Sequence, residues 1–451
     1  MVKLWNGEAV QWHLTFCMEG KAGSLEAGKA AGQLLVHLGS REKLTAEELR
    51  RIAAKSVKQV QNLGGNLVLL DVAAAVEILK EEGLAAVVQG AELALYHQEN
   101  WKEKSEDKSD IQLYLTGTED VDGGAILAET TVVDRWVCFA RDLVNCPSNK
   151  LTPVLLAEAV VQAAAGLDVE VQVLDDKVTR TLGMEAFHAV GDSSANPPRL
   201  IVLRYRGGGE AAPIALVGKG VTFDSGGYSL KPSTGMRGMK GDMAGGAAVC
   251  AAVLALAENQ AAINVTAVIP AVENRISSSS FLPDDVIGSM SGKTIEIGST
   301  DAEGRLILAD AITYAIRYEK ACKVVDIATL TGAMARMLGG VAIGVMANDD
   351  NFFTALQDAA GRSGEKFWRV PDYPEYKQLI ESQVADLYNS SDSCGAIAAG
   401  MFLSAFAGDT PWLHLDIAGA AWSGKLSQPY QPKGATGVGV TTLYQLCRSF
   451  A

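Results

Sequence analysis

The stretch Ile214-Ala-Leu-Val-Gly-Lys-Gly220 is a short apolar run that ends in glycines and a lysine, and the uncharged stretch 243–257 follows it. The first is typical of a buried strand and the second of a buried helix. Runs of the same strand type alternate with helical patterns at 169–174, 200–205, 264–270, 324–327, 341–346 and 412–417. Such near-continuous Val, Ile and Leu runs indicate strands covered on both faces. We therefore expect a largely parallel sheet between helices, with ligands bound beyond the carboxyl ends of its strands.

Residues 1–124 are predicted to form a smaller α/β domain ahead of this sheet. Thr45-Ala-Glu-Glu48 resembles a capping box that opens a helix, and the mixed-charge run 101–110 is expected to be a solvated loop. Further strands are expected at 8–18, 66–71 and 111–116, and a helix at 72–95. Residues 125–150 form a linker helix and a boundary loop that ends in Asn145-Cys-Pro-Ser-Asn149. The larger domain then covers 151–451, so the fold class is α/β with two domains of unequal size.

Composition and charge exclude several classes of protein. The chain has 451 residues, 48% of them hydrophobic, and a formal net charge of −14, which disfavours nucleic-acid and membrane-surface binding. The uncharged runs 243–257 and 395–408 are both shorter than a membrane span. The seven cysteines include no CxxC pair, and the first 20 residues lack a secretory-signal pattern. We expect a cytoplasmic protein with no nucleic-acid or membrane partner.

One Gly-rich segment concentrates charge beyond the run 214–217. It places Lys219, Asp224 and Lys231 in the loop predicted to follow that strand, and Asp242 stands directly before the apolar helix. A carboxylate at a helix start is often only an N-cap. Because the other three charged residues lie so near in sequence, we favour a functional site over a cap.

A second charged segment is Gly298-Ser-Thr-Asp-Ala-Glu-Gly-Arg305. Asp301, Glu303 and Arg305 are two residues apart, a spacing that puts all three on one side of an extended chain but not of a helix. We expect the following helix to begin after Gly304. The alternative is a capping loop with an acidic first turn.

Together the two segments supply four carboxylates, with no His or Cys nearby in sequence. Oxygen-rich sites suit divalent ions such as Mg, Mn and Zn, and four negative charges balance two such ions. A two-metal centre can activate a water molecule. Lys219, Lys231 and Arg305 could neutralise excess acid, polarise a carbonyl or, for a neutral amine, bind a metal, and spacing does not separate these roles.

The strings Val217-Gly-Lys-Gly-Val-Thr-Phe-Asp-Ser-Gly-Gly227 and Ser299-Thr-Asp-Ala-Glu-Gly-Arg-Leu306 closely resemble the leucyl aminopeptidase (cytosol aminopeptidase) family, whose signature is Asn-Thr-Asp-Ala-Glu-Gly-Arg-Leu. Ser299 replaces the usual Asn, which removes an amide but no ligand. The similarity continues through 141–145, 328–332, 414–419 and 433–437, and so covers about two-thirds of the chain, from residue 135 to the end.

The resemblance implies a metallo-aminopeptidase in which two divalent ions, Zn or Mn first and Mg or Co as alternatives, activate the attacking water. The metal ligands that it implies are Lys219, Asp224, Asp242, Asp301 and Glu303. Lys231 would polarise the scissile carbonyl, and Arg305 would hold a bicarbonate that relays a proton. The substrate cleft would be lined by Thr329, Leu330 and Gly332.

The same resemblance implies peptide substrates with a free N-terminus and a homohexameric assembly. Two alternatives are weighed beside it: a dipeptidase-like specialist of the same family, and a non-catalytic member that binds DNA or acts as a scaffold. The pI of about 4.9 and the full set of site residues favour the enzyme.

Overall fold

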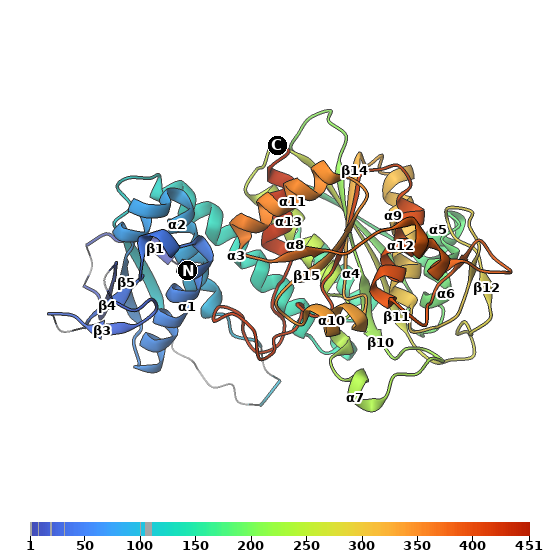
Figure 1. The fold of residues 1–451 in the computed structure, drawn as a ribbon, viewed down its shortest axis with the longest axis horizontal. Coiled ribbons are helices and arrows are strands. Elements are labelled where there is room, and N and C mark those ends of the chain that lie inside the picture. Colours follow the sequence, from blue (N-terminus) through green and yellow to red (C-terminus); the bar gives the residue numbers. More distant parts are fainter. Residues whose placement is uncertain (1, 8, 19, 31, 100, 104–110) are drawn as a thin grey trace. The chain divides into compact units, whose positions relative to one another are not determined.

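The computed structural model describes residues 2–7, 9–18, 20–30, 32–99, 101–103 and 111–451 (Figure 1). Residues 104–110 of the mixed-charge run 101–110, which we expected to be a solvated loop, therefore lie outside the described residues. The chain divides into two compact units. The N-terminal unit comprises 1–138, 362–364 and 425–433, and the larger unit comprises 139–361, 365–424 and 434–451. The helix α3 (Gly123–Asn145) contributes residues to both units.

The N-terminal unit contains a six-stranded sheet in the order β1-β6-β5-β2-β4-β3, which is parallel except for the β3–β4 pair. Its strands are β1 (Val2–Leu4), β2 (Trp12–Cys17), β3 (Leu25–Ala27), β4 (Gln33–His37), β5 (Leu67–Asp71) and β6 (Gln112–Thr116). The helices α1 (Ala46–Asn62) and α2 (Ala73–Ala94) pack against each other. The predicted cap is confirmed, because Thr45 Oγ1 accepts a hydrogen bond from the Glu48 amide at 3.2 Å.

The larger unit is built on a nine-stranded sheet in the order β16-β15-β18-β14-β9-β11-β8-β7, with β10 paired to β11. The strands are β7 (Val169–Leu174), β8 (Arg199–Arg206), β9 (Ile214–Gly218), β10 (Gly220–Asp224), β11 (Asn264–Asn274), β14 (Lys323–Ala328), β15 (Ile343–Ala347), β16 (Phe367–Arg369) and β18 (Trp412–Asp416). Every strand predicted from an apolar run is present. A second, three-stranded sheet contains β12 (Val286–Ile287), β13 (Ile295–Glu296) and β17 (Leu387–Tyr388).

The centre of this sheet is parallel, as expected, but its flanks are not. The pairs β9–β11, β14–β9 and β14–β18 are parallel, whereas β15 runs antiparallel to β18. The strands β8 and β7 add a further antiparallel edge. The edge strand β7 keeps only Leu174 buried, so it is not covered on both faces.

Helices cover both faces of the larger sheet (Figure 1). The helices α8 (Ala244–Glu258) and α13 (Val440–Arg448) pack together on one side, while α9 (Glu303–Arg317) packs with α6 (Glu185–Gly191) and α12 (Gly395–Ala407) on the other. The remaining helices are α4 (Pro153–Ala163), α5 (Asp176–Thr181), α7 (Ser233–Met236), α10 (Gly332–Leu338) and α11 (Asp350–Ser363). Short 3-10 turns lie at Arg41–Lys43, Ser148–Lys150, Met239–Gly241 and Pro374–Ile380.

The uncharged stretch 243–257 forms most of α8, which is a core helix. The helical stretch Met239–Glu258 is long and apolar enough to cross a membrane, yet 94% of its apolar window is buried within the fold. Both β9 and β11, against which α8 packs, are buried along their whole length. The sequence expectation of a buried helix is confirmed here.

Two local predictions differ from the structure. The residues Gly220–Asp224, expected to be loop, form β10, because they pair in parallel with the end of β11 after a register shift between Val221 and Phe223. The helix α9 begins at Glu303 rather than after Gly304. Asp301 therefore lies outside the helix, whereas Glu303 and Arg305 lie in its first turn and point in different directions.

Candidate metal centre and substrate cleft

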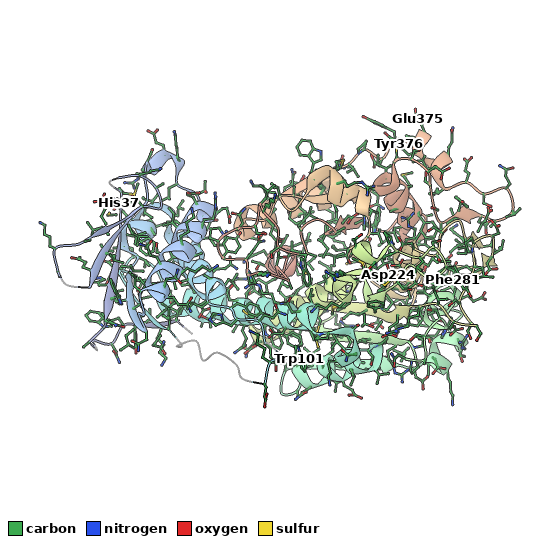
Figure 2. The ribbon with its side chains drawn as sticks, turned by 90° about the horizontal axis from the view of Figure 1, so that it is seen from below. His37, Trp101, Asp224, Phe281, Glu375 and Tyr376 are labelled. Carbon is green, nitrogen blue, oxygen red and sulfur yellow. The ribbon has the colours of Figure 1, made fainter. Side chains whose placement is uncertain are left out.

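Three of the predicted site residues lie at the carboxyl ends of strands of the larger sheet. Lys219 follows β9, Asp224 ends β10, and Thr329 follows β14 directly. Because β9 and β14 are adjacent and parallel, their ends meet at one edge of the sheet. Asp224 is buried inside the larger unit (Figure 2). The structure therefore brings these residues together at the edge of the sheet where the sequence predicts a ligand site.

Lys219 lies at the centre of the buried part of the site. Its Nζ atom contacts Asp242 Oδ2 at 2.8 Å and Glu303 Oε1 at 2.9 Å. It also donates a hydrogen bond to the Thr329 carbonyl at 3.0 Å. All three charged side chains are at most 6% exposed. Lys219 thus joins three segments of the chain at a single atom.

Asp242 is not a helix cap. It ends the 3-10 turn Met239–Gly241, and α8 begins only at Ala244. Its carboxylate pairs with Lys219 and accepts a hydrogen bond from Thr329 Oγ1 at 2.7 Å. The functional interpretation of Asp242 is favoured over the capping one, because its partners belong to the cleft.

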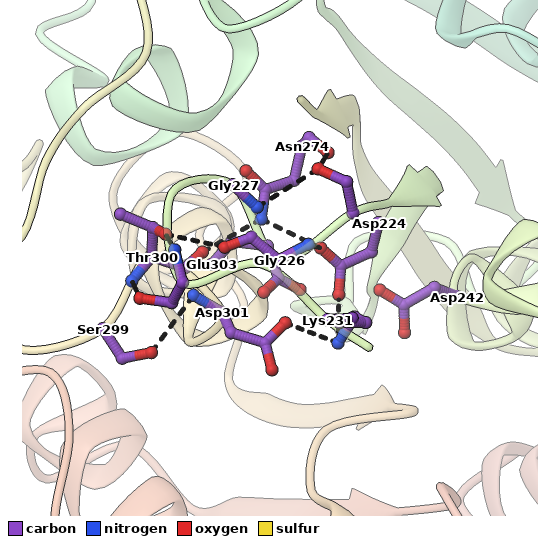
Figure 3. A network of polar contacts seen from close by, with 12 residues as sticks. Asp224, Gly226, Gly227, Lys231, Asp242, Asn274, Ser299, Thr300, Asp301 and Glu303 are labelled. Carbon is purple, nitrogen blue, oxygen red and sulfur yellow. Dashed lines mark hydrogen bonds and ion pairs between the residues drawn. The ribbon is translucent and has the colours of Figure 1, made fainter. Parts of the chain in front are cut away.

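Lys231 connects the other two carboxylates (Figure 3). Its Nζ atom contacts Asp224 Oδ2 at 2.8 Å and Asp301 Oδ1 at 2.5 Å. The Asp301 side chain is 37% exposed, whereas that of Asp224 is 2% exposed. Solvent exposure in the site therefore increases from the buried floor at Asp224 to the more open wall at Asp301.

The carboxylates of this floor fit divalent cations. Oxygens of Asp224, Asp242 and Glu303 lie within 4.8 Å of one another, and all three residues are buried. Glu303 Oε2 is buried and has no hydrogen-bond partner among the described residues. A dense set of carboxylate oxygens, one of them without a donor, has the chemistry of a site for a hard or borderline metal ion.

The raised pKa values show that the charged forms of these carboxylates are unfavourable without a bound metal ion. Burial, and after it repulsion from Asp224, raise the pKa of Glu303 to about 8 against the attraction of Lys219. Burial likewise raises the pKa of Asp242 to about 6. A bound cation would favour the charged carboxylates and so reverse both shifts.

The two lysines respond in the opposite sense. Burial lowers the pKa of Lys219, but attraction by Asp242 and Glu303 outweighs burial, so the pKa lies above its usual value. For Lys231 burial also lowers the pKa, but the combined attraction of Asp224, Glu303 and Asp301 outweighs burial, so its pKa is raised as well. Both lysines are therefore cations in this arrangement. A lysine that binds a metal ion through its nitrogen must first give up this proton.

Arg305 projects from the first turn of α9 on another side of the same cleft. Its Nη1 atom donates to the Asn389 carbonyl at 2.8 Å. Its Nε atom is buried and has no hydrogen-bond partner in the described parts of the chain. Burial lowers the pKa of Arg305 to about 10, with Glu303 and Asp416 opposing the shift. Arg305 therefore keeps donor capacity for a group that enters the cleft.

Asn274, which the sequence did not single out, positions Asp224. Its Nδ2 atom donates to Asp224 Oδ1 and to the Thr300 carbonyl, both at 2.9 Å (Figure 3). Asp224 Oδ1 also accepts the Gly226 amide at 2.8 Å. Thr300 Oγ1 in turn donates to the Gly226 carbonyl. Asn274 is the last residue of β11, so its only signal in the sequence was its place just beyond the strand predicted at 264–270.

Two further polar residues hold the cleft walls. Asp416, at the end of β18, accepts hydrogen bonds from Thr331 Oγ1 at 2.7 Å and from the Leu330 amide at 3.3 Å. Asn389 accepts from the Ser299 amide at 3.2 Å and donates to the Ser299 carbonyl at 2.8 Å. These bonds join segments 85 or more residues apart. Sequence spacing alone could not pair them.

All ten predicted site residues line one cleft of about 690 Å³ in the larger unit. They are Lys219, Asp224, Lys231, Asp242, Asp301, Glu303, Arg305, Thr329, Leu330 and Gly332. Met239, Ala421 and Trp422 add apolar surface to the same cleft. A cleft of this size, with apolar walls and charged groups at its base, can hold a short peptide or similar ligand.

Comparison with known proteins gives the same family for both units. Residues 138–444 match the catalytic domain of the cytosol aminopeptidase family, and residues 23–105 match its N-terminal domain. A probable cytosol aminopeptidase of Clostridium perfringens is 43% identical over 92% of this chain and 85% of its own length. One of Geotalea uraniireducens is 44% identical over the same shares.

Solved structures agree with this result. The bottromycin maturation enzyme BotP in complex with Mn has a TM-score of 0.91 and 33% identity, over 98% of this chain and all of BotP. A second structure of BotP has a TM-score of 0.89. With family matches in both units and this close structural likeness, the chain belongs to the cytosol aminopeptidase family.

Proposed function

We propose that this protein is a metal-dependent aminopeptidase that removes the N-terminal residue of peptides, and that it uses two divalent ions per chain. The observation that carries the proposal is the buried set of Asp224, Asp242 and Glu303, whose oxygens lie within 4.8 Å of one another at the base of a cleft. Membership of an aminopeptidase family supports the reaction class. The Mn bound by BotP supports a divalent metal.

The residues proposed to hold the ions are Lys219, Asp224, Asp242, Asp301 and Glu303. Asp224 and Glu303 would be shared between the two ions, as the resemblance implies, and both carboxylates are buried. Bound Zn or Mn, or alternatively Mg or Co, supplies Lewis-acid activation of water and of the substrate carbonyl. Asn274 and Gly226 hold Asp224 in place through hydrogen bonds to Oδ1.

Lys231 is proposed to stabilise the negative charge that develops on the scissile carbonyl oxygen. Its side chain is 17% exposed and lines the cleft, so its ammonium group can reach a bound peptide. A preorganised cation in a partly desolvated site is effective in this role. In this structure Lys231 is paired with Asp224 and Asp301. To contact the carbonyl oxygen it must leave these two aspartates, and this requires the metal ions to neutralise their charge instead.

Arg305 is proposed to bind a bicarbonate that relays a proton. Its planar guanidinium suits a planar trigonal anion, and its buried Nε lacks a partner among the described residues. The Asn389 carbonyl fixes one side of the guanidinium through Nη1. The free donor and the fixed orientation support a small anion as the occupant.

Thr329, Leu330 and Gly332 are proposed to contact the substrate. Thr329 and Leu330 belong to the loop between β14 and α10, and Gly332 is the first residue of α10. Asp416 holds this loop through the Leu330 amide and Thr331 Oγ1. We also propose a cytoplasmic homohexamer, which would follow the pattern implied by the resemblance.

End specificity tests this proposal. We expect the metal-loaded protein to hydrolyse leucine p-nitroanilide and not its N-acetyl derivative, because a free amino group is needed beside the ions. Equal rates on the two compounds would contradict exopeptidase action. Asp224→Asn should lose the hydrolysis, whereas Asp168→Asn, a matched change outside the lining of the cleft, should keep it.

A further inference from the structure

Two arginines of the cleft lining take no part in the network described above. Arg237 follows α7, and Arg336 lies on α10. Both are exposed, and neither forms an ion pair or side-chain hydrogen bond with any residue that the structure describes. Each therefore presents a full positive charge to the cleft without a protein partner.

The guanidinium of Arg336 lies close to the proposed substrate loop. A Cβ atom placed on Gly332 would be 3.3 Å from Arg336 Nη1. The side chain therefore folds back over the first turn of α10, beside the residues proposed to contact the peptide. Its charge lies at the wall of the cleft rather than away from it.

The other three cations of the lining are already engaged. Lys219 and Lys231 each contact two carboxylates, and Arg305 donates to a carbonyl. The four carboxylates of the lining are those proposed to hold the ions, so bound metal would neutralise them further. Arg237 and Arg336 then leave an excess of positive charge in the cleft of a chain whose formal net charge is −14.

We propose that Arg336, assisted by Arg237, forms a subsite for a carboxylate of the peptide substrate. The inference rests on the proposed aminopeptidase function and specifies its substrate class. A guanidinium can bind a carboxylate through two parallel N–H···O bonds, which gives orientation as well as attraction. The carboxylate can belong to an acidic side chain or to the C-terminus of a short peptide.

Three matched substrate pairs distinguish these sources. They are glutamate against glutamine p-nitroanilide, Leu-Asp-amide against Leu-Asn-amide, and Leu-Gly against Leu-Gly-amide. We expect wild type to favour the carboxylate member of at least one pair by on the order of tenfold in kcat/KM. The pair that shows the preference identifies the source of the carboxylate.

Variants connect the preference to the arginine. Arg336→Gln should bring the preferred pair close to parity, mainly through KM, while Arg336→Lys should keep part of the preference. Lys177→Gln removes a charge from an exposed position on α5, outside the cleft lining, and should keep the full preference. If Arg336→Gln does not fold, the preference of the wild-type protein is measured at low and at high salt instead. We expect high salt to abolish the preference, since salt screens exposed charges.

Two results would overturn the inference in different ways. Hydrolysis of the neutral peptides with no preference in any pair, or a preference unchanged in Arg336→Gln, would refute the carboxylate subsite and leave the proposed function standing. Failure of metal-loaded wild type to hydrolyse any of the six compounds would refute both.

Discussion

A single added methyl group at Gly304 tests whether the position of Lys219 matters. Gly304 lies in the first turn of α9, and a Cβ there would be 2.7 Å from Lys219 Cε and 2.8 Å from its Nζ. It would also be 3.0 Å from Leu330 Cδ1. Moving Nζ from 2.8 Å to the 3.4 Å at which ordinary contact begins takes at least 0.6 Å. We therefore expect Gly304→Ala to displace the Lys219 ammonium.

The expected effect is large on activity and small on stability. Nζ is held by three partners at 2.8–3.0 Å, so a shift of this size weakens all three contacts. Misplacement of a catalytic group by about 1 Å can cost about 10²-fold in rate. Overpacking costs about 1–3 kcal/mol, but alanine in place of a helical glycine returns about 1 kcal/mol. The net loss of unfolding free energy should be at most about 2 kcal/mol.

Gly361→Ala is the matched control. Gly361 lies within α11, and a Cβ there meets no atom within 4 Å. This variant should keep wild-type activity and gain up to about 1 kcal/mol of stability. The assay is kcat/KM on leucine p-nitroanilide beside thermal unfolding. Wild-type kcat/KM in a folded Gly304→Ala, within about twofold, would refute the argument that the packing of Lys219 sets the activity.

Lys231→Ala should lower kcat by about 10²–10³ with little change in KM, since the interaction acts on charge that develops in the transition state; a change confined to KM would contradict this role. Arg305→Ala should abolish any stimulation of kcat by bicarbonate added to carbonate-depleted buffer, and a wild-type response would disprove the relay. Light scattering should give about six times the 47.5 kDa chain mass, whereas a fully active monomer would exclude the hexamer as a requirement.

The strands and several element boundaries could be predicted because the signals are local. Continuous apolar runs marked all the central strands, and Thr45 with Glu48 marked the start of α1. The strand β10 gave no such signal, because its residues 220–224 contain Gly, Thr and Asp and are fixed by pairing with the end of β11. Antiparallel pairing at the flanks depends on the path of the whole chain, which apolar runs do not encode.

The site could be predicted as two charged segments but not as a network. The charge of Asp224, Asp301 and Glu303 in apolar surroundings was visible in sequence. The partners that hold them were not, because Asn274 lies 50 residues from Asp224 and Asn389 lies 90 from Ser299. The Ser299 substitution is accommodated locally, since its Oγ accepts the Asp301 amide at 3.2 Å. Short-range chemistry is readable from sequence, whereas long-range hydrogen bonds require the fold.

Metal content measured together with activity tests the central claim most directly. The protein is treated with a chelator, dialysed, and titrated with Zn or Mn while hydrolysis of leucine p-nitroanilide and bound metal per chain are recorded. We expect the chelated protein to be inactive, because four clustered carboxylates need cations to act as a site. Activity should return as the bound metal approaches two ions per chain. Full activity in metal-free protein would contradict the account, and full activity at one ion per chain would contradict its two-metal form.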